Sequence, residues 1–386
     1  MATFIISLIV AVSKVEANLC TIYAMDTDEQ IRAIEIEMAK TPYHKATQKW
    51  FGKMRAKIAK LRAQETDRQV KKGGGGGGGF GLKKFGDATV VLVGFPSVGK
   101  STLLNKLTNA NSPTAEYAFT TVSVIPGMMN YNGAQIQILD VPGLIEGAAR
   151  GFGRGREVLS VARGADLLLL IAEAGHEKSQ FTKIETELYQ NGVRLNEEEP
   201  NVVISKTLRG GIKINSTTSQ ELSRETIVEV VHEFGLINAE ITIKEKLDLD
   251  RLIDAFAPNR VYMPALYVIS KTDKHKAKYE HVISISAEKE IGLEELKEAI
   301  WNNLRLVRIN LRPAGKLALH PRGVSSNVEP LIMHEGQKLK DVLEAVSREM
   351  AQDKKAAKIW GPGARFPGQT VSFETRIQDG MEVTFI

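Results

Sequence analysis

Cysteine is nearly absent from this sequence, because its 386 residues include only Cys20. A single cysteine cannot form an internal disulfide bond, so nothing indicates a disulfide scaffold or an oxidising compartment. A strong excess of one charge is also missing, since 51 Lys and Arg residues stand against 46 Asp and Glu, and the net charge is +5. The composition, 43% apolar and 25% charged, excludes a collagen and a wholly disordered chain. The length predicts about two to three domains.

A long hydrophobic run is missing as well. The apolar stretch at residues 4–12 is shorter than the roughly 20 residues that a membrane-spanning helix needs. A secretory signal would carry positive charge before that stretch, whereas the first basic residue, Lys14, follows it. Met25 is followed at once by an acidic stretch that is typical of a helix start. We therefore expect residues 1–25 to be a non-native or disordered extension, and the protein to be cytoplasmic and not bound to membranes.

Residues 26–72 predict two helices, because apolar residues recur there at helical spacing. Pro42 separates the two, since proline disfavours a helical residue before it. Seven basic and no acidic residues lie between Lys45 and Arg62, and Trp50 and Phe51 stand among them. Two interpretations stay open, a solvated helix face and a contact with nucleic acid.

A glycine-rich linker is expected at residues 73–87, because residues 73–79 are all glycine and cannot bury side chains. Residues 88–305 then alternate apolar strands with helices, which predicts a doubly wound α/β domain with a parallel sheet. We expect a small inserted α/β subdomain at about residues 176–260. Residues 306–386 predict a further unit in which a small mixed sheet wraps one helix. The expected strands are residues 89–93, 136–139, 167–171, 266–269, 282–285, 306–309 and 382–386.

Residues 94–101 read G-F-P-S-V-G-K-S, the phosphate-binding pattern G-x-x-x-x-G-K-[ST]. The pattern follows an expected strand and opens an expected helix, which is the context that it needs. Its glycines let backbone N–H groups face phosphate, and the helix N-terminus adds its dipole. Lys100 is expected to neutralise the β- and γ-phosphates, and Ser101 to give a hydroxyl to Mg²⁺.

A second motif, D-V-P-G, follows the strand expected at residues 136–139. Asp140 is expected to hold Mg²⁺ through water, and Gly143 to offer its N–H to the γ-phosphate. Between the two motifs lies a pair of threonines, of which Thr121 is favoured as a metal ligand and sensor of the γ-phosphate. The predicted catalytic residues are thus Lys100, Thr121 and Gly143, and the predicted metal ligands are Ser101, Thr121 and Asp140.

Guanine recognition is expected at residues 270–273, which read S-K-T-D and resemble the guanine-reading pattern N-K-x-D. The Asp273 carboxylate can accept hydrogen bonds from N1 and N2 of guanine, which adenine does not offer. Lys271 can cover the base, whereas Ser270 replaces the asparagine of the pattern. The predicted nucleotide-binding residues are Gly94, Pro96, Ser97, Val98, Gly99, Lys100, Ser101, Thr102, Asp140, Gly143, Ser270, Lys271, Asp273, Ser286 and Ala287.

The residue after D-V-P-G is Leu144, where many small GTPases carry a glutamine that orients the attacking water. Leucine cannot orient water, so slow intrinsic hydrolysis is expected. A monovalent cation, a partner protein or the glycine-rich segment 143–156 could supply the missing group. Three arginines of that segment, Arg150, Arg154 and Arg156, could stabilise charge, contact RNA or have no catalytic role.

These motifs, with A-E-Y-A-F-T-T at residues 115–121 and D-V-P-G-L-I-E-G-A at residues 140–148, resemble the Obg branch of GTPases. Residues 34–47, 56–62, 86–90 and 208–212 are similar to developmentally regulated GTP-binding proteins, in a form that suggests an archaeal member. The resemblance implies a ribosomal-protein-like insert and a C-terminal TGS domain, a β-grasp module. It also implies partners, a ribosome or RNA bound through the TGS domain and the basic N-terminal helices, and a stabilising protein.

The function expected from residues and resemblance is a slow GTPase that acts as a nucleotide-dependent switch on the ribosome or RNA in translation or growth control. Its expected cofactors are Mg²⁺ and bound GTP or GDP. Some members of the family use K⁺, but Ser97 stands where related potassium-using GTPases have asparagine. Two alternatives are an RNA-binding scaffold with a structural nucleotide site and an Obg-like ATPase.

Overall fold

The computed structural model describes residues 27–72, 85–108, 124–141, 155–275, 282–312, 330–347 and 354–386. These residues fall into two compact units. One unit contains the helices before residue 73 and residues 191–262, and the other contains most of the remaining described residues. The two units are described separately below.

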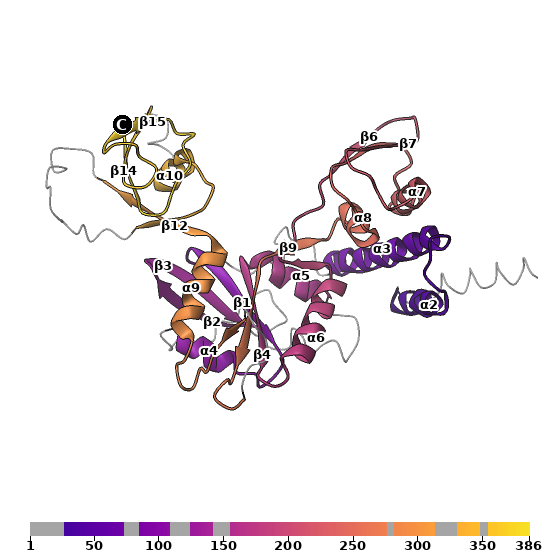
Figure 1. Cartoon of the computed structure of the whole chain (residues 1–386), viewed down its shortest axis with the longest axis horizontal. Helices are drawn as coiled ribbons and strands as arrows, with labels where there is room; N and C mark the ends of the chain where they lie inside the picture. The colour runs from indigo at the N-terminus through magenta and orange to yellow at the C-terminus, as the bar shows by residue number, and fades with distance from the viewer. Residues whose placement is uncertain are drawn as a thin grey trace, which may run out of the picture. The chain divides into compact units, whose positions relative to one another are not determined.

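A six-stranded sheet with the strand order β11-β10-β4-β1-β3-β2 forms the centre of the second unit (Figure 1). β2 is antiparallel to β3, and every other pair is parallel. The strands predicted by apolar runs are confirmed. The six strands are β1 (Ala88–Gly94), β2 (Ile125–Tyr131), β3 (Ala134–Asp140), β4 (Leu167–Glu173), β10 (Ala265–Ser270) and β11 (Ile283–Ser284).

Helices cover this sheet, because its strands are apolar on both faces. In β1, Val90 and Leu92 join one buried cluster with leucines of α4 and α9, while the alternate residues Val91 and Val93 are equally buried. α6 also packs on β4. The helices between the strands are α4 (Lys100–Leu107), α5 (Gly155–Gly164), α6 (Glu177–Gln190) and α9 (Leu293–Leu304).

The C-terminal part of the same unit is a five-stranded mixed sheet with the order β13-β12-β16-β14-β15. The helix α10 (Leu339–Val346) buries Leu339 and Val342 in the core of this sheet. β12 and β16 are parallel, and the other pairs are antiparallel. The strands are β12 (Leu306–Leu311), β13 (Leu331–His334), β14 (Ala357–Trp360), β15 (Gln369–Val371) and β16 (Met381–Phe385).

The first unit joins the N-terminal helices α2 (Thr27–Lys40) and α3 (Gln48–Lys72) to the insert. Its sheet has the order β6-β8-β7, and β5 and β9 form a separate two-stranded sheet. Helix α3 packs against α7 and α8. The insert elements are β5 (Val193–Leu195), β6 (Val202–Lys206), β7 (Ile212–Ser216), α7 (Arg224–Glu233), β8 (Ala239–Ile243), α8 (Leu249–Phe256) and β9 (Val261–Met263).

The insert begins later than the sequence analysis places it. The expected boundary near residue 176 would put α6 in the insert. Instead, α6 packs on β4 and belongs to the unit with the six-stranded sheet. The chain passes into the other unit at Asn191. The apolar face of α6, with Phe181, Ile184 and Leu188, is buried. No helix in the described ranges is long and apolar enough to cross a membrane.

Candidate functional site

The carboxyl ends of four neighbouring strands meet at one edge of the six-stranded sheet. β1 lies between β3 and β4, and β10 lies on the other side of β4. Because these strands are parallel, their last residues, Gly94, Asp140, Glu173 and Ser270, stand at the same edge. Ligands of open α/β sheets bind at this edge.

The loop between β1 and α4 needs its glycines for two different reasons. A Cβ on Gly94 would lie 2.6 Å from the carbonyl oxygen of Ile171, so a side chain there would collide with β4. Gly99 precedes α4 with φ +100°, and Ser97 has φ +61°, both in the left-handed region. Non-glycine residues in this region are uncommon and cluster at functional sites. The loop is thus held in a shape that leaves the N-terminus of α4 open.

Lys100 reaches back across this loop. Its ammonium group donates hydrogen bonds to the carbonyl oxygens of Gly94 and Phe95, each at 3.0 Å. These hydrogen bonds hold the ammonium group of Lys100 beside the backbone of the loop. An anion bound at the N-terminus of α4 would lie next to this positive charge.

Asp140 and Ser101 form the acidic side of the site. The Ser101 hydroxyl donates to Oδ2 of Asp140 at 2.7 Å. Asp140 is only 2% exposed, and its other oxygen, Oδ1, has no hydrogen-bond partner in the part of the chain described. An unsatisfied buried carboxylate oxygen is costly, and a cation beside it would remove that cost.

The donors of this pair suit a small hard cation. In the described ranges, no group of three or more His, Cys, Asp or Glu residues could hold a metal by itself. A hydroxyl and a carboxylate, completed by phosphate oxygens and water, are a donor set that Mg²⁺ accepts in nucleotide sites. Ser101 and Asp140 therefore fit Mg²⁺ that arrives with a phosphate ligand.

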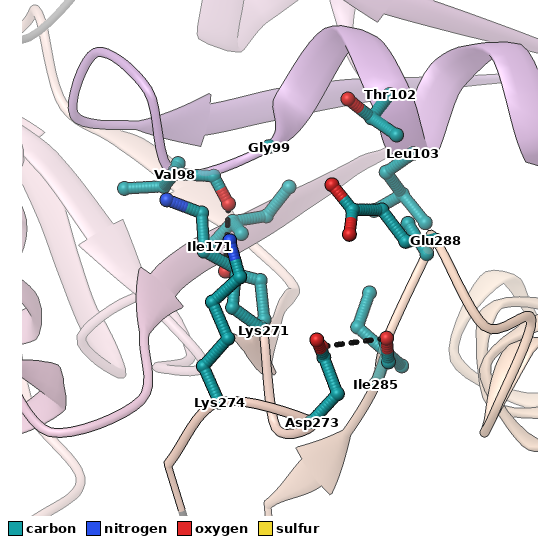
Figure 2. A pocket seen from close by; sticks show the side chains of 13 residues that line it. Val98, Gly99, Thr102, Leu103, Ile171, Lys271, Asp273, Lys274, Ile285 and Glu288 are labelled. Carbon is teal, nitrogen blue, oxygen red and sulfur yellow. Dashed lines mark hydrogen bonds between the residues drawn. The ribbon is translucent and has the colours of Figure 1, made fainter.

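A pocket lies beside the N-terminus of α4 and brings separate motifs together (Figure 2). The loop before α4, the residues after β10 and the residues after β11 all line it. The lining residues are Val98, Gly99, Thr102, Leu103, Ile171, Ser270, Lys271, Asp273, Lys274, Ile285, Ser286, Ala287 and Glu288.

Ser270, which stands where the N-K-x-D pattern has asparagine, joins its loop to the phosphate loop. Its buried hydroxyl lies 2.7 Å from the carbonyl oxygen of Val98 and 3.1 Å from that of Ala172. A hydroxyl has one hydrogen to donate, and the shorter contact is the one to the phosphate loop. The loss of an amide thus leaves a direct connection between the two loops.

The hydroxyl of Ser286 holds Asp273 in the pocket. It donates to Oδ1 of Asp273 at 2.7 Å, a bond that Figure 2 draws as a dashed line to Asp273. The bond, with smaller contributions that include Lys289 and Lys274, lowers the pKa of Asp273 below its ordinary value of 3.8. The carboxylate therefore stays ionised at neutral pH and can accept N–H groups from a ligand.

Hydrogen bonds join the two ends of the loop that carries Ser286. Ser286 and Ile291 exchange two backbone hydrogen bonds of 3.1 Å. Between them, Glu290 pairs with Lys106 of α4 at 2.6 Å. This ion pair ties the loop to the last turn of α4.

Lys271 is oriented by a carboxylate that the sequence analysis did not single out. Its ammonium lies 3.0 Å from Oε1 of Glu173, at the end of β4, and its backbone is left-handed with φ +57°. Both side chains are about three-quarters buried, with 27% and 28% exposed. Glu173 therefore fixes the lysine that is expected to cover the base.

Of the predicted nucleotide-binding residues, the pocket is lined by Val98, Gly99, Thr102, Ser270, Lys271, Asp273, Ser286 and Ala287. Gly94, Pro96, Ser97, Lys100, Ser101 and Asp140 are not among its lining residues, and two further predicted residues cannot be placed. Thr121 and Gly143 lie outside the described residues, as do Leu144, Arg150 and Arg154 and the side chain of Arg156. The sequence analysis missed the pocket walls Leu103, Ile171 and Ile285. It also missed Lys274 and Glu288, although each directly follows a predicted residue.

The basic N-terminal segment is largely engaged inside its own unit. Phe51 is 5% exposed and belongs to the insert core, and Trp50 packs against that core. Five of the seven cations form ion pairs: Lys49 and Lys53 with Glu229, Arg55 with Asp250, Lys60 with Glu233, and Arg62 with Glu35. The two aromatic residues thus pack in this unit, and most of the basic residues have acidic partners within it.

Comparisons with known proteins agree with this site. The family model described as "50S ribosome-binding GTPase" matches residues 89–206, and a model for the C-terminal region of the same domain matches residues 209–306. An uncharacterized GTP-binding protein of Methanocaldococcus jannaschii is 43% identical, with 94% of this chain and 93% of that protein covered. GTP-binding protein 1 of Schizosaccharomyces pombe is 40% identical over 93% of this chain and 98% of its own.

A human relative carries the family name. Developmentally-regulated GTP-binding protein 2 of Homo sapiens is 38% identical, with 89% of this chain and 94% of that protein covered. Among solved structures, the Schizosaccharomyces pombe YchF GTPase aligns with a TM-score of 0.39 at 12% identity, over 79% of this chain and 99% of its own. The phosphate loop and the sequence relatives lead to the same result: the chain belongs to the developmentally regulated GTP-binding proteins, an Obg-type family with a P-loop GTPase domain.

Proposed function

We propose that this protein hydrolyses GTP slowly to GDP and phosphate and acts as a nucleotide-dependent switch on the ribosome or RNA. One observation carries the catalytic part. A single pocket is lined both by the phosphate loop, through Val98 and Gly99, and by Asp273 and Ser286 of the later loops. One nucleotide can therefore meet Lys100 with its phosphates and Asp273 with its base.

Mg²⁺ is the proposed cofactor. Ser101 and Asp140 would hold it, because the pair offers a hydroxyl and a buried carboxylate oxygen without a partner among the described residues. The ion would neutralise phosphate charge as it develops in the transition state. Around it, Lys100 orients the β- and γ-phosphates, and we place Thr121 and Gly143 at the γ-phosphate from their motifs alone.

Slow turnover is proposed because Leu144 replaces the glutamine that orients water in many small GTPases. A group outside this motif must then complete the site. Without this group, the protein stays in its GTP-bound state. Hydrolysis follows when a partner or an ion supplies the group.

The C-terminal sheet is the proposed contact with RNA, and we assign it to the TGS type. Numbered within this sheet, its strands run in the order 2-1-5-3-4 with α10 after the second strand, which is a β-grasp arrangement. Phe366 is 60% exposed between Arg365 and Pro367 in the β14–β15 loop. An exposed aromatic ring beside a cation suits an unstacked base and its phosphate.

Three measurements on the full chain test this function. Multiple-turnover phosphate release, with and without ribosomes, measures hydrolysis, and Lys100→Ala is the inactive control. Co-sedimentation with ribosomes in GTP, a non-hydrolysable analogue and GDP measures the switch. Pelleting that depends on the nucleotide supports a switch, whereas equal pelleting without turnover would make the protein a scaffold. A competition titration in which ATP displaces GTP equally well would reject guanine selection.

A further inference from the structure

One end of the insert sheet gathers three chain segments. Lys206 at the end of β6 and Ile212 at the start of β7 both pair with Ala239, the first residue of β8. The loop 207–211 therefore crosses over the start of β8, and Figure 1 draws it as the connection from β6 to β7. We call residues 206–213 together with residues 236–238 the insert tip.

Two hydrogen bonds that Asn238 accepts give the insert tip a defined shape. Its side-chain oxygen accepts from the N–H of Gly211 at 2.8 Å, and its carbonyl accepts from the N–H of Thr207 at 3.2 Å. Gly210 and Gly211 have φ +112° and +71°, and a Cβ on either would meet nothing within 4 Å. No described atom lies close to these two glycines on the side where a Cβ would stand. A partner could therefore approach their backbone from that side.

Two aliphatic side chains project from this tip. Leu208 is 100% exposed and Ile237 is 73% exposed, and no other large hydrophobic residue in the described ranges is as exposed as these two. Single exposed apolar residues are common on protein surfaces. Here, however, the two stand on loops that Asn238 fastens together, which makes them parts of one surface.

The insert tip is also basic. Lys206, Arg209 and Lys213 are exposed, and none of them forms an ion pair within the described part of the chain. Glu240, the cross-strand neighbour of Lys213, accepts a hydrogen bond from Asn215 instead. Exposed cations that form no ion pair with the described residues favour a polyanionic partner by charge complementarity.

We propose that the insert tip docks on helical RNA. Lys206, Arg209 and Lys213 contact phosphates, and Leu208 and Ile237 lie in the minor groove. Single-stranded RNA is recognised mainly by aromatic stacking, and residues 206–213 and 236–238 contain no aromatic side chain. The minor groove of an A-form helix is wide and shallow and is read by shape, which suits short aliphatic groups. The inference deepens the proposed function, since it rests on RNA being the target.

Binding of a labelled RNA duplex of about 20 base pairs to the full chain tests the proposal by fluorescence anisotropy at several salt concentrations. The double variant Lys206→Ala/Arg209→Ala should bind about 10-fold more weakly, and its salt slope should fall by about 2. Leu208→Ser should weaken binding without a change in slope. The matched control is Lys244→Ala/Lys246→Ala, which removes two cations beyond the other end of β8 and should bind the duplex like the wild type.

Three results would overturn the proposal. One is a wild-type chain that does not bind the duplex, and another is a tip variant that binds it with unchanged affinity. The third is loss of ribosome pelleting by a tip variant that still binds the duplex normally, which would assign the tip to a protein partner. Pelleting that is independent of nucleotide, together with duplex binding that depends on the tip, would reject the switch and leave this inference intact. GTP affinity should be the same in all these variants.

Discussion

The hydroxyl of Ser270 donates a 2.7 Å hydrogen bond to the carbonyl oxygen of Val98, and this bond joins the base loop to the phosphate loop. Ser270 is 5% exposed, so the bond is shielded from water. Removal of the donor leaves a buried carbonyl that must find another partner. A contact of one side chain thus couples the two halves of the nucleotide pocket.

Ser270→Ala should weaken GDP and GTP binding by about 1–2 kcal/mol, or about 5- to 30-fold, because a buried acceptor loses its partner. Titration with a fluorescent GDP analogue measures the change. Ser205→Ala, which removes an exposed hydroxyl on β6, is the matched control and should bind like the wild type. Equal affinities for Ser270→Ala and the control would show that the loops do not depend on this bond.

Asp273→Asn should change the base selectivity of the pocket from guanine to xanthine. The amide cannot accept both guanine N–H groups as the carboxylate does, so GTP affinity should fall by about 100-fold or more. Xanthosine triphosphate, which carries an oxygen in place of the N2 amino group, should bind better than it does to the wild type. Competition titrations with both nucleotides measure this, and unchanged GTP affinity would remove Asp273 from base recognition.

The pH dependence of GTP binding should report the bond between Ser286 and Asp273. This bond lowers the pKa of Asp273 below 3.8, so the ionised acceptor persists as pH falls and is lost only through the lowered value. Ser286→Ala should raise that pKa and move the acid loss of GTP affinity to higher pH. Titrations from about pH 6 down to about pH 2, through the ordinary pKa of an aspartate, compare the two proteins. If both proteins lose GTP affinity over the same pH range, the hydrogen bond from Ser286 is not what lowers the pKa of Asp273.

Asp140→Ala should remove most of the benefit that Mg²⁺ gives to GTP binding. In the wild type, chelation of Mg²⁺ should weaken GTP, because Ser101 and the buried Asp140 would hold the ion against the phosphates. The variant should bind GTP about equally with Mg²⁺ and with a chelator. Glu294→Ala, at an 80% exposed carboxylate, should keep the wild-type response. A full Mg²⁺ response in Asp140→Ala would place the ion elsewhere.

Phe51→Ala should destabilise the unit that joins the N-terminal helices to the insert by about 3–5 kcal/mol, since it leaves a cavity in a packed core. Urea denaturation followed by circular dichroism measures the loss. Tyr43→Ala is the control, because Tyr43 touches the Phe51 ring but is 56% exposed and should cost far less. If both variants have the same midpoint, α3 does not depend on Phe51 for its anchorage.

The central strands were predictable because their Val, Ile and Leu runs are buried on both faces. β2 was not, since Pro126 and Gly127 interrupt its apolar pattern, and such residues are tolerated there because β2 lies at the sheet edge. The start of the insert was misplaced because no change in composition separates α6 from the residues that follow it. Family membership, by contrast, followed from motifs that are short and contiguous.

Within the site, motif residues could be predicted because each motif fixes its own local geometry. Glu173 could not, because its contact with Lys271 depends on β4 lying between β1 and β10, which only the strand order reveals. The pocket walls are ordinary apolar residues whose role comes from tertiary position. The basic residues of α3 were ambiguous for the same reason, since their acidic partners on α7 and α8 are distant in sequence.

The packing of α3 on α7 and α8 also constrains the order of events during synthesis. Arg55 and Asp250 are 195 positions apart in the chain, and the GTPase strands β1, β3 and β4 are translated between them. Phe51 and its apolar neighbours therefore lack the cover that α7 and α8 supply until the insert has left the exit tunnel. During that interval part of the apolar face of the nascent helix is exposed, a state that is prone to aggregation.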